Sequence, residues 1–299
     1  MLTCTNEAFN KNTGLTKEYK LNKAGVDYLH SVLNNSIEPA VYDQQIIKQW
    51  IESEFKAELE SRKFNYEDKS NRLWHPIQSL RREHKTRILA QHSLKYHYDI
   101  QCAAPTLILQ HAQHHAMDLY LSALNVYLTH KTQIRQQLAE EMEVDVKTIK
   151  IIINALFCGA RIGLNPDFAI SQLLNNDAAR IEYLKQNNFI NELRGDIKTC
   201  WDYITPTMYR TSIIDKNNKS RLLPINSKQK WARYFDLERT ILNSVVNYLT
   251  SHQYHYFLEH DGWACDHLIL VNDLSDYVFE QTGYRVVFEQ EQSLSDVCE

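Results

Sequence analysis

The stretch that decides the fold is Tyr256-Phe257-Leu258-Glu259-His260-Asp261-Gly262-Trp263-Ala264-Cys265, two short apolar runs around a polar turn. Apolar runs of this length on either side of an Asp-Gly pair predict a β-hairpin. Hairpin chemistry alone explains the turn. It does not explain a carboxylate at the turn between two apolar strands, so this hairpin is also a candidate site of chemistry.

The segments around this hairpin predict a mostly helical chain with a small antiparallel sheet. We expect helices over 46–64, 106–128, 133–142, from Asp145 to about 156, over 167–194, 235–250 and 272–282, the last ended by Gly283. Residues 93–101 and 285–289 read as strands, residues 1–45 as a polar lead-in, and residues 205–233 as irregular and basic. The predicted fold class is therefore α+β.

Composition excludes several classes of protein. The 299 residues carry a net charge of −4, so any nucleic-acid site must be a local basic patch. Only 7 glycines are present, and neither GxGxxG nor GxxxxGK[ST] occurs, which disfavours Rossmann-type and P-loop chemistry. The six cysteines form no CxxC pair, no apolar run reaches the ~18 residues of a membrane helix, and no signal sequence opens the chain. We expect a cytoplasmic protein without a membrane partner.

Three further segments carry side chains suited to chemistry. Arginine and lysine crowd residues 68–87, including Arg72, Arg81 and Arg82, which suits contacts to phosphate. Asp99 ends a predicted strand before a Pro-Thr turn and a helix. The helix after Asp145 presents one roughly common side, made of Lys147, Lys150, Asn154, Phe157 and Arg161. Taken singly, these are also explained as a solvated helix face, a helix cap and an amphipathic helix.

The order of the four segments resembles the right-hand polymerases, specifically family A DNA polymerases and single-subunit phage-type RNA polymerases. Asp68-x-x-Asn71-Arg72 resembles the T/D-x-x-G-R element, with Asn71 in place of Gly. Tyr98-Asp99 with Pro105-Thr106-Leu107 resembles motif A, and Lys150-x7-Cys158-Gly159 resembles motif B (K-x7-Y-G). His260-Asp261 resembles motif C. The resemblance spans roughly 66–163 and 234–290.

The resemblance implies a role for each matched residue. Asp99 and Asp261 would hold two Mg²⁺ ions, for which Mn²⁺ can substitute, and Lys150 with Lys147 would meet the nucleoside triphosphate. Phe157 or Cys158 would lie near the nascent base pair, beside Asn154 and Arg161. Arg72, Arg81, Arg82 and His260 would contact the DNA template and primer.

Two departures from the family pattern bear on the substrate. Ala104 stands where family A DNA polymerases carry the Glu that excludes a ribose 2′-hydroxyl. The pattern Asp-x5-Pro-Thr also resembles family B polymerases, and in that alignment the Tyr that excludes ribonucleotides again falls on Ala104. Ribonucleotides are therefore expected to be accepted. Cys158 replaces the motif B Tyr, which leaves template positioning and sugar discrimination open.

The length allows a palm, fingers and little else. The resemblance divides the chain into a helical extension or reduced thumb (1–65), a first palm segment (66–130), fingers with a basic insert (131–233) and a second palm segment (234–299). A minimal enzyme of this kind suits primer synthesis, so we expect a small DNA-dependent RNA polymerase acting as a primase in phage or plasmid replication. A replication partner protein would add grip on the template.

The basic insert predicts a path for single-stranded nucleic acid. Residues 216–233 hold six basic and no acidic residues, among them Lys228, Lys230 and Arg233, with Trp231 nearby. A solvated loop explains the same composition. His111, His114 and His115 lack a carboxylate or Cys partner at metal-ligand spacing and are read as exposed or core-facing.

Three other interpretations remain open. A small family A-like DNA polymerase differs from the primase only in its choice of sugar, for which Ala104 is the sequence clue. A non-catalytic nucleic-acid-binding scaffold would keep the palm fold without the chemistry. An unrelated helical interaction protein would match the four motifs by chance.

Overall fold

A four-stranded antiparallel sheet places the hairpin beside the strand that ends near Asp99. The structure, a computed structural model, describes residues 2–10, 14–21, 82–214 and 220–291. The strands lie in the order β6 (Tyr256–Leu258), β7 (Gly262–Cys265), β3 (Tyr96–Ile100) and β8 (Phe288–Glu291). The class is therefore α+β, as the sequence predicted.

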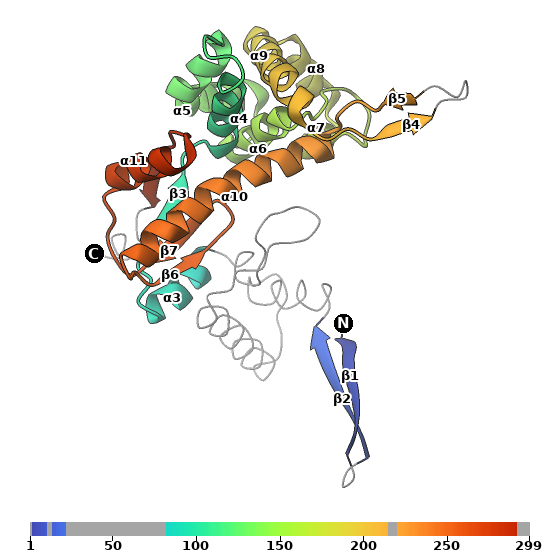
Figure 1. Ribbon diagram of the computed structural model, residues 1–299. Coiled ribbons are helices and arrows are strands. Elements are labelled where there is room, and N and C mark those ends of the chain that lie inside the picture. Colours follow the sequence, from blue (N-terminus) through green and yellow to red (C-terminus); the bar gives the residue numbers. More distant parts are fainter. Residues whose placement is uncertain (1, 11–13, 22–81, 215–219, 292–299) are drawn as a thin grey trace.

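Two helices cover one face of this sheet. The long helix α10 (Ser227–Ser251) and α11 (Val271–Thr282) pack against each other and against the sheet (Figure 1). Tyr98 of β3 stacks on its cross-strand partner Trp263, with ring centroids 5.3 Å apart. The Tyr98 hydroxyl accepts a hydrogen bond of 2.7 Å from the backbone N–H of Ile269, which ties the loop before α11 to the sheet.

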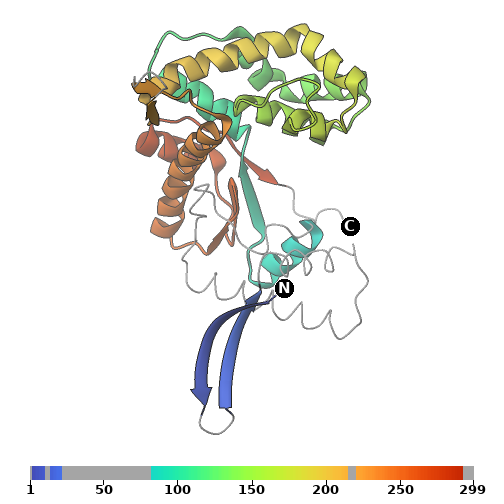
Figure 2. The same cartoon turned by 90° about the vertical axis from the view of Figure 1, so that its right-hand side faces the viewer.

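A second core lies within a bundle of helices. The bundle consists of α4 (Ala103–Gln113), α5 (Ser122–Met142), α6 (Val146–Phe157), α7 (Ala169–Leu173), α8 (Ala178–Gln186) and α9 (Asn188–Ile204). Both views show the bundle at one end of α10 and the sheet along its other half (Figures 1 and 2). Helix α4 contributes residues to both cores and so joins them.

The remaining elements are short. Helix α3 (Arg82–Gln91) precedes β3, and the 3₁₀ turn η2 (Thr205–Thr207) follows α9. A small hairpin, β4 (Ser212–Ile214) with β5 (Ser220–Leu222), projects beyond the bundle (Figure 1). Near the amino terminus β1 (Leu2–Asn10) pairs with β2 (Gly14–Leu21). In the described part of the chain no helix is long and apolar enough to cross a membrane.

Most of the predicted elements around the central hairpin are confirmed. The hairpin itself, the strand before Asp99, the last strand and the helix ended by Gly283 all form, and Gly283 adopts a left-handed φ of 73°. Asp145 caps α6, since its side chain accepts a 2.7 Å hydrogen bond from the N–H of Thr148. These signals are local, which is why the sequence shows them.

Other predictions are wrong in their boundaries. The predicted helix 106–128 is divided between α4 and α5, and the predicted helix 133–142 is the end of α5, which kinks at His130. The N-terminus of α5 is capped from a distance: the Asp196 carboxylate of α9 accepts a 2.9 Å bond from the N–H of Leu124. Residues 205–233, predicted irregular, hold η2, β4, β5 and the first turns of α10. The lead-in contains a hairpin, and the predicted helix 46–64 lies outside the described residues.

Gly262 is required by a close approach between strands rather than by the turn. Its φ is not positive, so the conformational freedom of glycine is not used in the two-residue turn His260–Asp261. Instead, a Cβ at position 262 would lie 2.3 Å from the backbone oxygen of Tyr98. Only glycine therefore allows β7 to pair with β3 at this point.

Replacing Gly262 with Ala is expected to destabilise the fold by about 2–4 kcal/mol, because rigid backbone stands where the new methyl group would go. Urea unfolding followed by circular dichroism measures this.

Gly195 offers a matched control in α9, since a Cβ there meets no atom within 4 Å. Gly195→Ala should stabilise the protein by about 0.5–1 kcal/mol. Equal effects of the two substitutions would contradict the close approach.

Candidate active site

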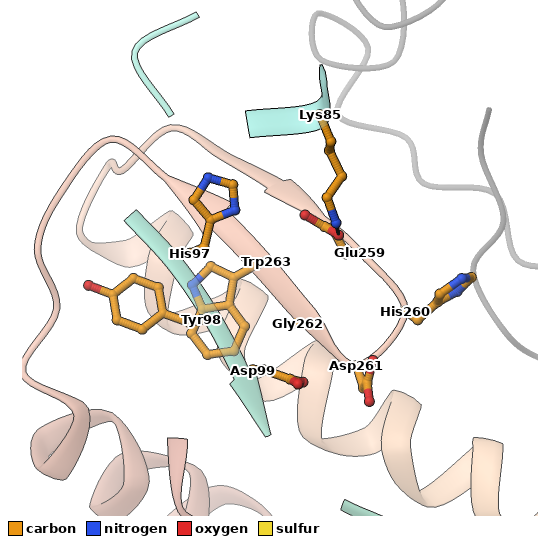
Figure 3. A pocket seen from close by; sticks show the side chains of 9 residues that line it. All are labelled: Lys85, His97, Tyr98, Asp99, Glu259, His260, Asp261, Gly262 and Trp263. Atoms are coloured by element: carbon orange, nitrogen blue, oxygen red, sulfur yellow. Dashed lines mark hydrogen bonds and ion pairs between the residues drawn. The ribbon is translucent and has the colours of Figure 1, made fainter. Parts of the chain in front are cut away.

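Asp99 and Asp261 lie at the same edge of the sheet. In register, Asp99 faces Gly262, the residue after Asp261. The backbone N–H of Ile100 donates to the Asp261 carbonyl oxygen at 3.3 Å and to Asp99 Oδ1 at 2.8 Å. Figure 3 shows the two carboxylates projecting into the same space, whereas His260 points away from them. The fold thus brings together the two carboxylates that the sequence singled out.

Basic side chains from two bundle helices face these carboxylates across a cavity of about 60 Å³. Lys131 and Arg135 come from α5 and Lys150 from α6, and Glu289 of β8 joins the two aspartates. Three cations therefore oppose three carboxylates across one cleft. Its other lining residues are Ile100, Cys102, Ala103, Ala104, Asn154 and Tyr234.

Arg135, which follows the kink of α5 at His130, is held in place by Tyr127, a buried tyrosine that precedes the kink. Its Nε donates to the Tyr127 hydroxyl at 2.8 Å, and Nη2 donates to the same oxygen and to Cys102 Sγ. Tyr127 is fully buried, and this burial raises the pKa of its hydroxyl to about 12, so the oxygen accepts as a neutral phenol. A guanidinium fixed in this way keeps its remaining donors ready for an anion.

Sequence reasoning missed Lys131, Arg135 and Glu289. Lys131 and Arg135 are four residues apart and so share one helix face. This spacing is the signal in the sequence that could have indicated them. Glu289 is found only through register, because it pairs with Asp99 across the β3–β8 ladder.

The two aspartates also line a second cavity, of about 230 Å³. Lys85 of α3 forms an ion pair there with Glu259, the residue before the turn (Figure 3). Both side chains are largely buried, at 19% and 16% exposure. The pair joins two segments 174 positions apart and fixes α3 against the turn. Lys85 thus lines a cavity with the two aspartates, and its positive charge is neutralised by Glu259.

Only part of the predicted nucleotide face of α6 reaches the cleft. Lys150 and Asn154 line it, and Lys147 is exposed but does not. Phe157 and Cys158 are each 0% exposed and lie within the two cores, so neither presents a surface to a ligand. Arg161 lies beyond the helix, with its guanidinium 5.9 Å from the Phe168 ring centroid. Lys150 and Asn154 therefore lie on the side of α6 that lines the cleft, whereas Phe157 lies on the side that packs into the core.

The residues predicted to contact nucleic acid are divided similarly. Lys228 is exposed near the start of α10. Lys230 instead lies over the Trp201 ring, and Arg233 bonds to His111. Arg72 and Arg81 fall outside the described residues, and of Arg82 only its place in α3 is described.

His111 of α4 joins α10 and the loop after α11 as a buried, neutral imidazole. Its Nε2 accepts a 2.9 Å bond from Arg233 Nη2 of α10, which leaves the proton on Nδ1, 2.7 Å from the Tyr284 hydroxyl. Burial, and next the charge of Arg233, lower the pKa of His111 to about 4. His114 and His115 are exposed, so the three histidines behave as the sequence predicted.

Comparisons with known protein families and with characterised proteins find no match for this chain. In the part of the chain that the structure describes, no group of three or more His, Cys, Asp or Glu side chains is arranged to hold a metal ion. The donor set at the cleft is therefore best described as a pair of aspartates with Glu289 nearby.

The low pKa of His111 predicts a loss of stability in acid. The unfolded chain takes up a proton near pH 6.5, whereas the folded protein does so only near pH 4. The free energy of unfolding should therefore fall by about 2–3 kcal/mol through this group as the pH falls across that window.

Urea unfolding at pH 7 and pH 4.5 measures this effect in wild type and in His111→Gln, which should lose about 2 kcal/mol of the pH dependence. The exposed His114 provides the control His114→Gln, which should keep it. A pH dependence unchanged in His111→Gln would refute the assignment.

Proposed function

We propose that this chain is a template-directed nucleotidyltransferase, most specifically a small DNA-dependent RNA polymerase that makes replication primers. The observation that carries the proposal is that Asp99 and Asp261 lie together at one end of the sheet and line one cleft with Lys131, Arg135 and Lys150. A carboxylate from a strand and one from the turn beside it, in one cleft with basic helix side chains, suit phosphoryl transfer.

The donor set fits Mg²⁺. This ion is bound through one or two carboxylates and keeps waters and substrate phosphates as its other ligands. Asp99 and Asp261 would hold it, with Glu289 adjacent to Asp99 in register. Two such ions, when bound, would supply activation of the attacking hydroxyl and neutralisation of the leaving pyrophosphate.

The chain's own residues would bind and orient the reactants. Lys150, Lys131 and Arg135 would hold the triphosphate, so that its α-phosphorus lies before the carboxylates. The 3′-hydroxyl of the growing strand would lose its proton to water as its oxygen forms a bond to that phosphorus, and the bond to the bridging oxygen would break to release pyrophosphate. The three cations offset the charge that gathers on the leaving group.

Ala104 supports the choice of ribonucleotides. It lies in the first turn of α4 and lines the same cleft as Lys150 and Asp99. A methyl group leaves room for a 2′-hydroxyl that a longer side chain would exclude. The same geometry serves a DNA polymerase, so only the sugar distinguishes these two interpretations.

The template path that we propose crosses the basic segment before and within α10. Arg210, Arg221 and Lys228 are exposed there, and Tyr209 is 86% exposed beside them. Charges of one sign with an accessible ring suit single-stranded nucleic acid. A replication partner protein would add grip on this strand.

The test is synthesis on single-stranded DNA with Mg²⁺ and labelled nucleotides, without primer, in wild type and Asp261→Ala. Short RNA products are expected from wild type and none from the variant, because one of the two carboxylates is lost. Separate ribonucleotide and deoxyribonucleotide pools test the inference from Ala104.

Asp118→Ala serves as the control, since Asp118 is exposed between α4 and α5 and does not line the cleft. It should retain synthesis. Extension of a primer with deoxyribonucleotides alone would replace the primase with the DNA polymerase. Wild-type protein that binds DNA but synthesises nothing in either format would favour the non-catalytic scaffold.

A further inference from the structure

The first turn of α10 contacts the carboxyl-terminal ends of two bundle helices. Ser227 donates through Oγ to the carbonyl oxygen of Gly159 at 3.1 Å, just after α6. One turn later, Lys230 Nζ lies 5.0 Å from the centroid of the Trp201 ring of α9. Trp201 Nε1 in turn donates to the Phe157 carbonyl oxygen at 2.6 Å, at the last residue of α6.

Lys230 fills space that Gly159 leaves open. Gly159 has a left-handed φ of 85°, and a Cβ there would lie 3.3 Å from Lys230 Cδ. Burial lowers the pKa of Lys230, although Asp202 acts in the opposite direction. The lysine stem is thus enclosed between Gly159 and the indole of Trp201, instead of extending into solvent.

This junction supports the end of α6 electrostatically. The carbonyl groups at a helix C-terminus carry partial negative charge and lack partners within the helix. Here one of these oxygens, that of Phe157, accepts a bond from Trp201, and the carbonyl of Gly159 just beyond the helix accepts one from Ser227. The Lys230 ammonium lies nearby over the Trp201 ring.

The position of this end decides where the cleft residues of α6 lie. Lys150 precedes Phe157 by seven residues, or about 10 Å along a rigid helix. A small rotation of α6 at its carboxyl end would therefore shift Lys150 relative to Asp99 and Asp261. Tyr234, one turn after Lys230, lines the cleft itself.

We propose that Lys230 is a positioning residue: it anchors the carboxyl-terminal end of α6 to α10 and thereby sets Lys150 opposite the carboxylates. It acts through Gly159 and Trp201 and makes no contact with nucleic acid. The role in nucleotide binding rests on the proposed function, whereas the anchoring of α6 stands without it.

The test compares Lys230→Met, which keeps the stem and removes the charge, with Lys228→Met, the exposed neighbour. Hydrogen exchange of the Gly159 and Ala160 amides is expected to become about fivefold faster in Lys230→Met and to stay unchanged in Lys228→Met. The nucleotide KM should rise about threefold or more in Lys230→Met, with kcat within about twofold.

Nucleic-acid binding should respond in the opposite way. Affinity for single-stranded DNA and its salt dependence are expected to fall in Lys228→Met and to stay at the wild-type level in Lys230→Met. Lys230→Arg, which restores a cation over the indole, should recover both slow exchange and the nucleotide KM.

Weaker DNA binding by Lys230→Met, with exchange at Gly159 and Ala160 unchanged, would overturn the proposal. If Lys230→Met fails to fold, Lys230→Arg keeps a cation over the indole, and faster exchange at Gly159 and Ala160 in that variant than in wild type would also overturn the proposal. If the wild type synthesises nothing, the proposed function fails, and the exchange measurements alone still decide whether Lys230 anchors α6.

Discussion

The close approach of β7 to β3 at Gly262 is the contact on which the rest of the site depends. The missing side chain there lets the strand after the turn run within hydrogen-bonding distance of Tyr98 and Asp99. Tyr98 and Trp263 then stack on the covered face, while Asp99 and Asp261 come to the same edge. A larger residue would separate the strands and the two carboxylates together.

The opposite wall of the cleft depends on how α10 joins the sheet to the bundle. Its middle lies on the sheet core, and its amino-terminal turns reach α6, α9 and α4 through Ser227, Lys230 and Arg233. The cations of α5 and α6 are thereby held across from the aspartates. Buried Tyr127 and His111 serve the same arrangement, since each orients an arginine through a neutral ring.

The sequence predicted what local chemistry determines and missed what long-range contacts determine. Asp145 and Gly283 mark helix ends through their own backbone neighbourhoods, so they could be read directly. The start of α5 could not, because its cap is Asp196, 72 residues later. The sequence singles out Gly262 as part of a turn, but glycine is needed there because the carbonyl of Tyr98 lies too close for a side chain. Tyr98 is far earlier in the chain, so no local pattern predicts this contact.

The same distinction holds for the candidate site. Asp99, Asp261 and Lys150 were predicted by motif order, and the fold brings them to one cleft. The same motif also predicted Phe157 and Cys158 as site residues, yet both are buried in the core. Lys230 and Arg233 were grouped by charge alone, and the structure gives each a partner inside the protein. The sequence shows where basic residues cluster, but packing decides which of them remain available to bind a ligand.

Calorimetric titration with Mn²⁺ tests the central claim most directly, using wild type, Asp99→Asn, Asp261→Asn and the double variant. If the two carboxylates form one site, either single substitution should abolish most of the binding, and the double variant should be little worse than either single one. Losses that simply add, with each single variant keeping about half of the binding free energy, would show two independent carboxylates and contradict the account.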